Sequence, residues 1–187
     1  VDEVACTEAW NISVNETDEW GTNMTGATDL IDSYPIISWD ESGPEYIYRF
    51  STSAASMIMV YLSNMTVDLD IFVLDGGPSG ACNSLNAIRA GDTYAAFPAL
   101  SNHYYYLVVD GYFGVSGPFT ISVYSNDNVY SSYYLPSKVP NALDMYTTGA
   151  THEGADPSFA SCGQTTGNAS VWFYIVAPRD GEVSIDT

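Results

Sequence analysis

Hydrophobic and polar residues alternate over several short stretches in the first two thirds of the chain. Residues 119–123 (F-T-I-S-V) alternate apolar and hydroxyl side chains, which is the period of two of a half-buried strand. Residues 104–109 (Y-Y-Y-L-V-V) are apolar or aromatic at both sets of positions, so we expect a central strand there. Residues 68–73 (D-L-D-I-F-V) form a third such run.

Turn signals separate these runs and no stretch carries a convincing helical stripe. Glycine-containing turns are expected at residues 75–78, 89–92, 110–111 and 117–118, where glycine or proline interrupts the pattern. Short strands at regular spacing with glycine turns are typical of an antiparallel β-sandwich or jelly roll. The sequence therefore predicts an all-β fold.

The chain also repeats part of itself. The segment N-M-T-G-A-T-D from Asn23 returns as Y-T-T-G-A-T-H from Tyr146, an offset of 123. The strand expected at residues 46–51 returns at residues 171–176, an offset of 125. The first copy runs on to about Tyr124. We therefore predict a complete module in residues 1–125 and an incomplete second module in residues 126–187.

A module that cannot bury its apolar face alone needs a neighbour. We expect either another subunit or following sequence of the same longer chain to complete residues 126–187. Completion by another copy is a head-to-tail contact, which propagates into a filament if it does not close. The expected partner is therefore a second copy of this chain.

The amino-acid composition limits the partners and the cellular location that we expect. Of 187 residues, 46% are apolar, which is globular rather than disordered. The net charge of −19 makes nucleic acids and anionic membranes poor partners and cations such as calcium good ones. No apolar run approaches the roughly 18 residues of a membrane span, so membrane insertion is not expected. The acidic, tyrosine-rich and lysine-poor composition indicates an extracellular or cell-surface protein.

The cysteines and the glycosylation signals also indicate an extracellular protein. Cys6 and Cys82 both lie in the first module, so we expect them to form a disulfide and Cys162 to be free or linked to another chain. Asn-X-Ser/Thr signals for N-linked glycans occur at Asn11, Asn15, Asn23, Asn64 and Asn168. Five exceeds what composition gives by chance, and the alternative is a set of accidental matches in a threonine-rich β-protein.

Four motifs follow one another in the first module: G-P-E-Y-I-Y-R-F at 43–50, D-L-D-I-F-V-L-D-G at 68–76, Y-Y-Y-L-V-V-D-G-Y at 104–112 and G-P-F-T-I-S-V at 117–123. Together they resemble the bacterial pre-peptidase C-terminal domain. The resemblance covers nearly all of the chain, because residues 126–187 look like the opening half of another such domain. It implies a non-catalytic β-sandwich of secreted proteins, related to the collagen-binding domains of collagenases.

The same resemblance implies a calcium site. In those relatives the site joins an acidic N-terminal segment to acids just before the Y-x-F strand. The corresponding residues here are Asp2, Glu3, Asp40 and Glu45. The spacing departs from the family pattern, and Pro44 stands where an acidic or polar residue is common.

Residues for catalysis are sparse. A Ser/His/acid triad needs a histidine, and the chain has only His103 and His152, both expected in loops. No G-x-S-x-G or H-E-x-x-H motif and no zinc-spaced cluster occurs, although a carboxylate pair for glycoside hydrolysis remains open. We expect no enzyme.

Some acidic and aromatic side chains allow both a structural and a functional interpretation. We interpret Asp68 and Asp70 as solvent-facing residues of an edge strand, and the alternative is that they bind calcium. We interpret Asp75 and Asp110 as residues that shape turns. The aromatic residues Trp10, Trp20, Trp39, Tyr112 and Phe113 are interpreted as caps of the core, with stacking on sugar rings as the alternative.

The sequence thus favours a non-catalytic, glycosylated extracellular protein that assembles head to tail by strand complementation. The alternative is a pair of accessory modules, binding a carbohydrate or a protein polymer, in a secreted protease or other multidomain exoprotein.

Overall fold

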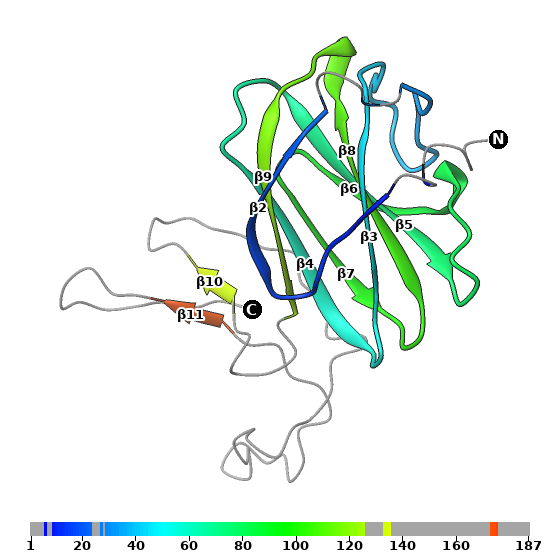
Figure 1. Ribbon diagram of the computed structural model, residues 1–187, viewed down its shortest axis with the longest axis vertical. Helices are drawn as coiled ribbons and strands as arrows, with labels where there is room; N and C mark the ends of the chain where they lie inside the picture. Colours follow the sequence, from blue (N-terminus) through cyan, green and yellow to red (C-terminus); the bar gives the residue numbers. More distant parts are fainter. Residues whose placement is uncertain are drawn as a thin grey trace, which may run out of the picture.

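The computed structural model describes residues 6, 9–23, 27, 29–125, 133–135 and 173–175. These residues form β-strands and two short 3-10 helices (Figure 1), so the predicted all-β class is confirmed. The strands are β1 Trp10–Asn11, β2 Glu16–Thr22, β3 Tyr46–Ser51, β4 Ser56–Ser63, β5 Leu69–Gly77, β6 Ala87–Gly91, β7 Tyr94–Ala99, β8 Tyr104–Gly111, β9 Pro118–Ser125, β10 Tyr133–Leu135 and β11 Phe173–Ile175. The 3-10 helices are η2 Ser84–Asn86 and η3 Tyr112–Gly114. Within the described ranges no helix has the length and hydropathy to cross a membrane.

The strands of the first module form a sandwich of two sheets. The five-stranded sheet has the order β1-β3-β8-β5-β6 and the four-stranded sheet the order β2-β9-β4-β7. Residues 12–15 join β1 to β2, which Figure 1 shows as a tight connection between two dark blue strands, and residues 92–93 join β6 to β7. Short connections therefore link the two sheets at both sides of the sandwich.

Alternation along the strands builds the core between the sheets. Ile58, Val60 and Leu62 of β4 face the five-stranded sheet and are buried in one cluster with residues of β3, β5 and β8. β8 is the middle strand of its sheet, as its apolar residues on both faces predicted. Burial of such side chains contributes about 1.5–3 kcal/mol each.

A third layer covers the outer face of the five-stranded sheet. Phe72 of β5 and Val108 of β8 point outward there and are fully buried. Ile31 and Tyr34 from the segment before β3 pack on them, and the ring of Tyr34 stacks on Phe72 with centroids 3.7 Å apart. Residues 29–41 thus form a cover over this sheet, and we call them the covering segment.

The structure corrects one interpretation of β5. Asp70 was interpreted as a solvent-facing residue of an edge strand, but β5 lies between β8 and β6 and the covering segment leaves Asp70 buried. Asp68 precedes the strand and is exposed. The edge interpretation is therefore wrong for Asp70.

Candidate functional site

A parallel strand pair is the most informative local feature. In a sandwich that is otherwise antiparallel, β1 pairs with β3 in parallel, with Trp10 opposite Tyr48. The pair β10 and β11 is also parallel, with Tyr133 opposite Phe173 (Figure 1). Residue numbers in the two pairs differ by 123 for the first strand and by 125 for the second. These are the offsets of the sequence repeat, so the strand pair that opens the first module occurs again after it.

The second copy of this pair has an open edge in the described part of the chain. β3 lies between β1 and β8, whereas β11 pairs with β10 and with no other described strand. A sheet of two strands is marginally stable in water, and three or more are needed for independent stability. The predicted boundary near residue 125 stays a prediction.

Exposed aromatic rings lie at the edges of the first module. Trp10 is 61% exposed, Trp20 64% and Phe113 65%, so the interpretation of these three as core caps is wrong. The ring of Trp10 is parallel to that of Tyr46 within 3°, with centroids 6.3 Å apart. Trp39 fits the expected role better, because its ring contacts the buried Phe72 edge-on.

The Trp10 and Tyr46 rings connect to the core through Tyr48. Tyr46 contacts Tyr48, and both rings contact Phe119 across the sandwich. Burial, and the nearby Glu19 carboxylate, raise the pKa of the Tyr46 phenol. The buried Tyr48 hydroxyl has no hydrogen-bond partner among the described residues, and its burial raises its pKa well above the usual range. The edge at β1 thus places the exposed ring of Trp10 parallel to that of Tyr46, with the Glu19 carboxylate near Tyr46.

Four carboxyl groups are buried near one end of the sandwich: Glu41, Glu45, Asp70 and Asp110. Burial and the charges of Asp70, Asp68 and Asp40 raise the pKa of Glu41 to about 8. Burial and the charges of Asp68 and Asp92 raise that of Asp70 to about 7. Burial raises the pKa of Asp110 to about 9, although the hydrogen bond from Tyr34 opposes the shift.

The raised pKa values favour the neutral forms of Glu41 and Asp110 at neutral pH, and neutral carboxyls cost less to bury than charged ones. A catalytic carboxylate pair must reach its substrate. Glu41 is 0% exposed and Asp70 is 4% exposed. We therefore interpret this pair as structural.

Of the four residues that the resemblance implies as calcium ligands, only Asp40 and Glu45 lie among the described residues. Asp2 and Glu3 lie outside the described residues. Asp40 is exposed, while Glu45 is buried and its Oε1 accepts hydrogen bonds from the backbone N–H groups of Leu30 and Ile31. In the described part of the chain, no three His, Cys, Asp or Glu residues are arranged to hold a metal ion. The calcium site stays a prediction.

The glycosylation signals differ in their surroundings. Asn11, Asn15 and Asn64 are exposed, and Asn15 and Asn64 have positive φ values of 71° and 55°, as expected in turns. Asn23 is fully buried, donates from Nδ2 to the Pro44 carbonyl at 2.6 Å and accepts at Oδ1 from the Gly117 N–H at 2.8 Å.

A glycan would have to replace a hydrogen of the buried Asn23 amide, so we exclude Asn23 from the sites that we propose. Asn168 lies outside the described residues.

The structure joins Cys6 and Cys82 by a disulfide, with their Cα atoms 6.0 Å apart. The disulfide packs beside the covering segment, in the same buried cluster as Ile31 and Tyr34. Cys162 lies outside the described residues.

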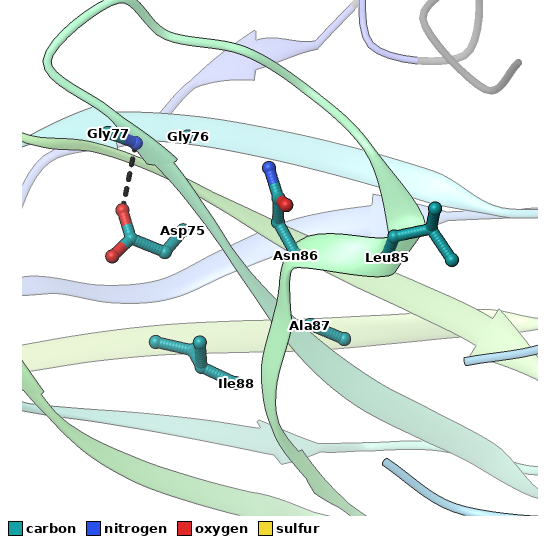
Figure 2. Close-up of a pocket in the computed structure, with 7 residues that line it drawn as sticks. All are labelled: Asp75, Gly76, Gly77, Leu85, Asn86, Ala87 and Ile88. Atoms are coloured by element: carbon teal, nitrogen blue, oxygen red, sulfur yellow. Dashed lines mark hydrogen bonds between the residues drawn. The ribbon is translucent and has the colours of Figure 1, made fainter. Parts of the chain in front are cut away.

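A shallow groove of about 390 Å³ lies where β5 and η2 meet, lined by Asp75, Gly76, Gly77, Leu85, Asn86, Ala87 and Ile88 (Figure 2). The Asp75 carboxylate accepts a hydrogen bond of 2.8 Å from the Gly77 N–H, which is the turn-shaping role expected from the sequence. Its Oδ1 also lies 3.0 Å from Nδ1 of His103. Asp75 is the one ionisable residue of the lining. His152 lies outside the described residues.

Two examples illustrate the solved structures to which this chain is similar. The pre-peptidase C-terminal domain of a collagenase from Bacillus anthracis matches with a TM-score of 0.44 and 21% identity, over 62% of this chain and 94% of that one. PliG of Aeromonas hydrophila, a periplasmic inhibitor of g-type lysozyme, matches with a TM-score of 0.39 and 12% identity, over 62% and 93% of the two chains. No protein-family model and no curated protein matches the chain. The first of these structures belongs to the family that the four motifs resemble.

Proposed function

We propose that the protein is a non-catalytic extracellular structural protein whose tandem β-modules assemble head to tail by strand complementation. The observation that supports this most is the second parallel pair, β10 and β11, at the offsets of the sequence repeat. In the first module the equivalent pair continues into β8, β5 and β6.

The open edge of β11 is the proposed assembly site. Its backbone N–H and C=O groups form a template for another strand. A strand from a second copy extends the two-stranded sheet and gives the main-chain hydrogen bonds that stabilise strand addition. Because donor and acceptor surfaces differ, the contact is heterologous and builds a filament unless it closes into a ring.

The setting outside the cell is supported by two features of the first module. A disulfide between Cys6 and Cys82 persists in an oxidising compartment. The exposed Asn11, Asn15 and Asn64 provide places for glycans on the surface.

Assembly is tested with the protein of residues 1–187 and a control of residues 1–125. We expect polymers of the longer protein in sedimentation velocity and electron microscopy, and monomers of the shorter one. Tyr174→Pro in β11 removes a backbone donor from this short strand and is expected to reduce polymerisation. A monodisperse monomer of residues 1–187 that resists proteolysis throughout residues 126–187 contradicts the proposal.

A second candidate function is an accessory module that binds a carbohydrate or a protein polymer. The exposed ring of Trp10, parallel to that of the half-buried Tyr46, favours it, because aromatic ring faces suit the faces of sugar rings. The test is co-sedimentation with an insoluble neutral polysaccharide and with collagen fibrils. Trp10→Ala is expected to abolish binding and Trp39→Ala to preserve it. Equal binding of both variants contradicts this function.

A further inference from the structure

The outer face of the four-stranded sheet carries an apolar surface. Along β4, Ile58 and Val60 face the core between the sheets, so Met57, Met59 and Tyr61 point to the other side. Met59 lies opposite Ala96 of β7 and Tyr124 of β9. We define the methionine face as Met57, Met59, Tyr61, Tyr94, Ala96 and Tyr124, six residues that form one cluster.

The two methionines of this face are buried as deeply as the core. Met57 and Met59 are both 0% exposed, and their neighbours in β4 are equally buried on the inner side. A strand that is buried on both faces is covered by a layer on each. In the described part of the chain, the half-buried apolar residues that pack on this cluster are Tyr61, Tyr94 and Tyr124, which belong to the same face.

The outer face of the five-stranded sheet has such a layer. There, Phe72 and Val108 are buried under Ile31 and Tyr34 of the covering segment. Among the described residues, the cluster around Met57 and Met59 contains no apolar side chain from outside the methionine face. The methionine face therefore needs a cover from elsewhere.

The composition of the face indicates the chemistry of that cover. None of its six residues carries a charge at neutral pH, and methionine is a flexible side chain that adapts to irregular apolar partners. The rings of Tyr61 and Tyr94 contact each other edge-on with centroids 5.7 Å apart. An apolar protein surface fits these residues, whereas a highly hydrated glycan does not.

The course of the chain indicates which protein surface it is. β9 ends at Ser125, opposite Ile58 of β4, and the preceding Tyr124 lies opposite Met59. The chain therefore leaves the first module at the edge of the methionine face, and residues 126–187 follow immediately.

We propose that residues 126–187 dock on the methionine face, so that the two modules share a fixed apolar interface instead of a free linker. This goes beyond the proposed function, because docking within one chain requires no polymerisation and polymerisation requires no docking. Each can fail while the other holds.

Methionine oxidation tests the proposal, because a buried thioether reacts slowly with peroxide and an exposed one quickly. The proteins compared are residues 1–187 and residues 1–125, whose buried core lies within the shorter protein. We expect Met57 and Met59 to oxidise at least about tenfold faster in the shorter protein, since their protection is local. Met65, half-buried against the core between the sheets, is the internal control and is expected to react equally in both.

Equal oxidation of Met57 and Met59 in the two proteins overturns the proposal. Protection in residues 1–187 that is lost on dilution also overturns it, because the cover is then a second copy.

A substitution gives an independent readout. Met59→Lys in residues 1–187 places a charge in the interface and is expected to increase the rate of proteolysis within residues 126–187 by about tenfold. The control is Leu100→Lys, which makes the same kind of change at a half-exposed residue just after β7 and leaves that rate unchanged. If Met59→Lys lowers the thermal stability of residues 1–125 as well, the oxidation rates alone decide. An unchanged rate of proteolysis in a folded Met59→Lys variant contradicts the docking.

Discussion

The hydroxyl group of Tyr34 donates a hydrogen bond of 2.7 Å to Oδ2 of Asp110, 76 residues away in the chain. This bond fixes the covering segment to β8, the middle strand of the five-stranded sheet. Oδ1 of Asp110 accepts from the Gly111 N–H at 2.8 Å, the turn-shaping role predicted from the sequence. One buried carboxyl group thus connects the cover, the central strand and the turn that follows it.

The first prediction concerns this contact. Tyr34→Phe keeps the stacking on Phe72 and removes only the hydroxyl donor. We expect the free energy of unfolding to fall by about 1–3 kcal/mol, because the carboxyl of Asp110 loses a partner in a buried place. Urea denaturation at pH 7 measures this change. Tyr34→Ala is expected to cost more, since it removes the ring as well, and equal stability of Tyr34→Phe and the parent protein contradicts the prediction.

The second prediction concerns pH. The pKa values of Glu41, Asp70 and Asp110 rise from 4.5, 3.8 and 3.8 to about 8, 7 and 9 in the folded state. The folded state therefore binds more protons than the unfolded chain between these limits, and stability falls as pH rises through that range. The stabilising contribution of these groups is complete below about pH 4 and is lost progressively up to about pH 9. Thermal unfolding of residues 1–125 between pH 4 and pH 9 measures it.

A matched pair of variants separates this effect from general charge repulsion. Glu41→Gln replaces the buried acid by a neutral group of similar shape, so we expect it to raise stability at pH 8–9 by about 1 kcal/mol and to flatten the pH profile. Asp32→Asn removes one exposed charge of the covering segment and leaves the profile close to that of the parent. A stability that increases with pH in the parent protein contradicts the prediction.

Local sequence patterns predicted the strands of the sandwich, but they did not predict which strands pair with each other. Alternation in residues 119–123 and 68–73 predicted β9 and β5, and the run that is apolar at both sets of positions in residues 104–109 predicted the central strand β8. The parallel pairing of Trp10 with Tyr48 was not predicted. Two residues carry too little pattern to define a strand, and the contact spans the whole covering segment.

The functional residues were harder to predict for a related reason. Asp68 and Asp70 alternate with apolar residues, a pattern that predicts solvent-exposed acids. Asp70 is buried because the covering segment, which is distant in sequence, lies over its strand. Glu41 was not singled out at all, since no motif marks a buried acid. Trp10 and Trp20 carry the residue type of a core and are exposed because they lie on edge strands. Burial of single side chains depends on contacts between distant segments.

The third prediction separates two sequence signals that look alike. Asn64 is exposed, and Asn23 is buried with both ends of its amide hydrogen-bonded. In a host that glycosylates asparagine, we expect glycans at Asn64 and at Asn11 or Asn15, and none at Asn23. Glycopeptide mapping decides this, with Thr66→Ala, which destroys the signal at Asn64, as control. A glycan at Asn23, or a bare Asn64, contradicts the prediction.

Asn23 also allows a stability test in a host without glycosylation. Asn23→Ala removes a donor and an acceptor from a buried place, so we expect it to lower the free energy of unfolding by about 2–3 kcal/mol. Thr66→Ala serves again as the control, because Thr66 is exposed and exposed substitutions change stability by about 0.5 kcal/mol or less.

The last prediction concerns the disulfide. Cys6 and Cys82 are separated by 76 residues, and closing a loop of this length restricts the unfolded chain. In the chain-entropy model the stabilisation is about 4–5 kcal/mol. We therefore expect the double variant Cys6→Ser, Cys82→Ser to unfold at a markedly lower temperature, and a reductant to lower the melting temperature of the parent but not of the variant. Because the disulfide packs beside Ile31 and Tyr34, the covering segment is expected to become the first site of proteolysis in the variant. Non-reducing peptide mapping provides the direct check, since a free thiol at Cys6 or Cys82 in the oxidised protein contradicts the prediction.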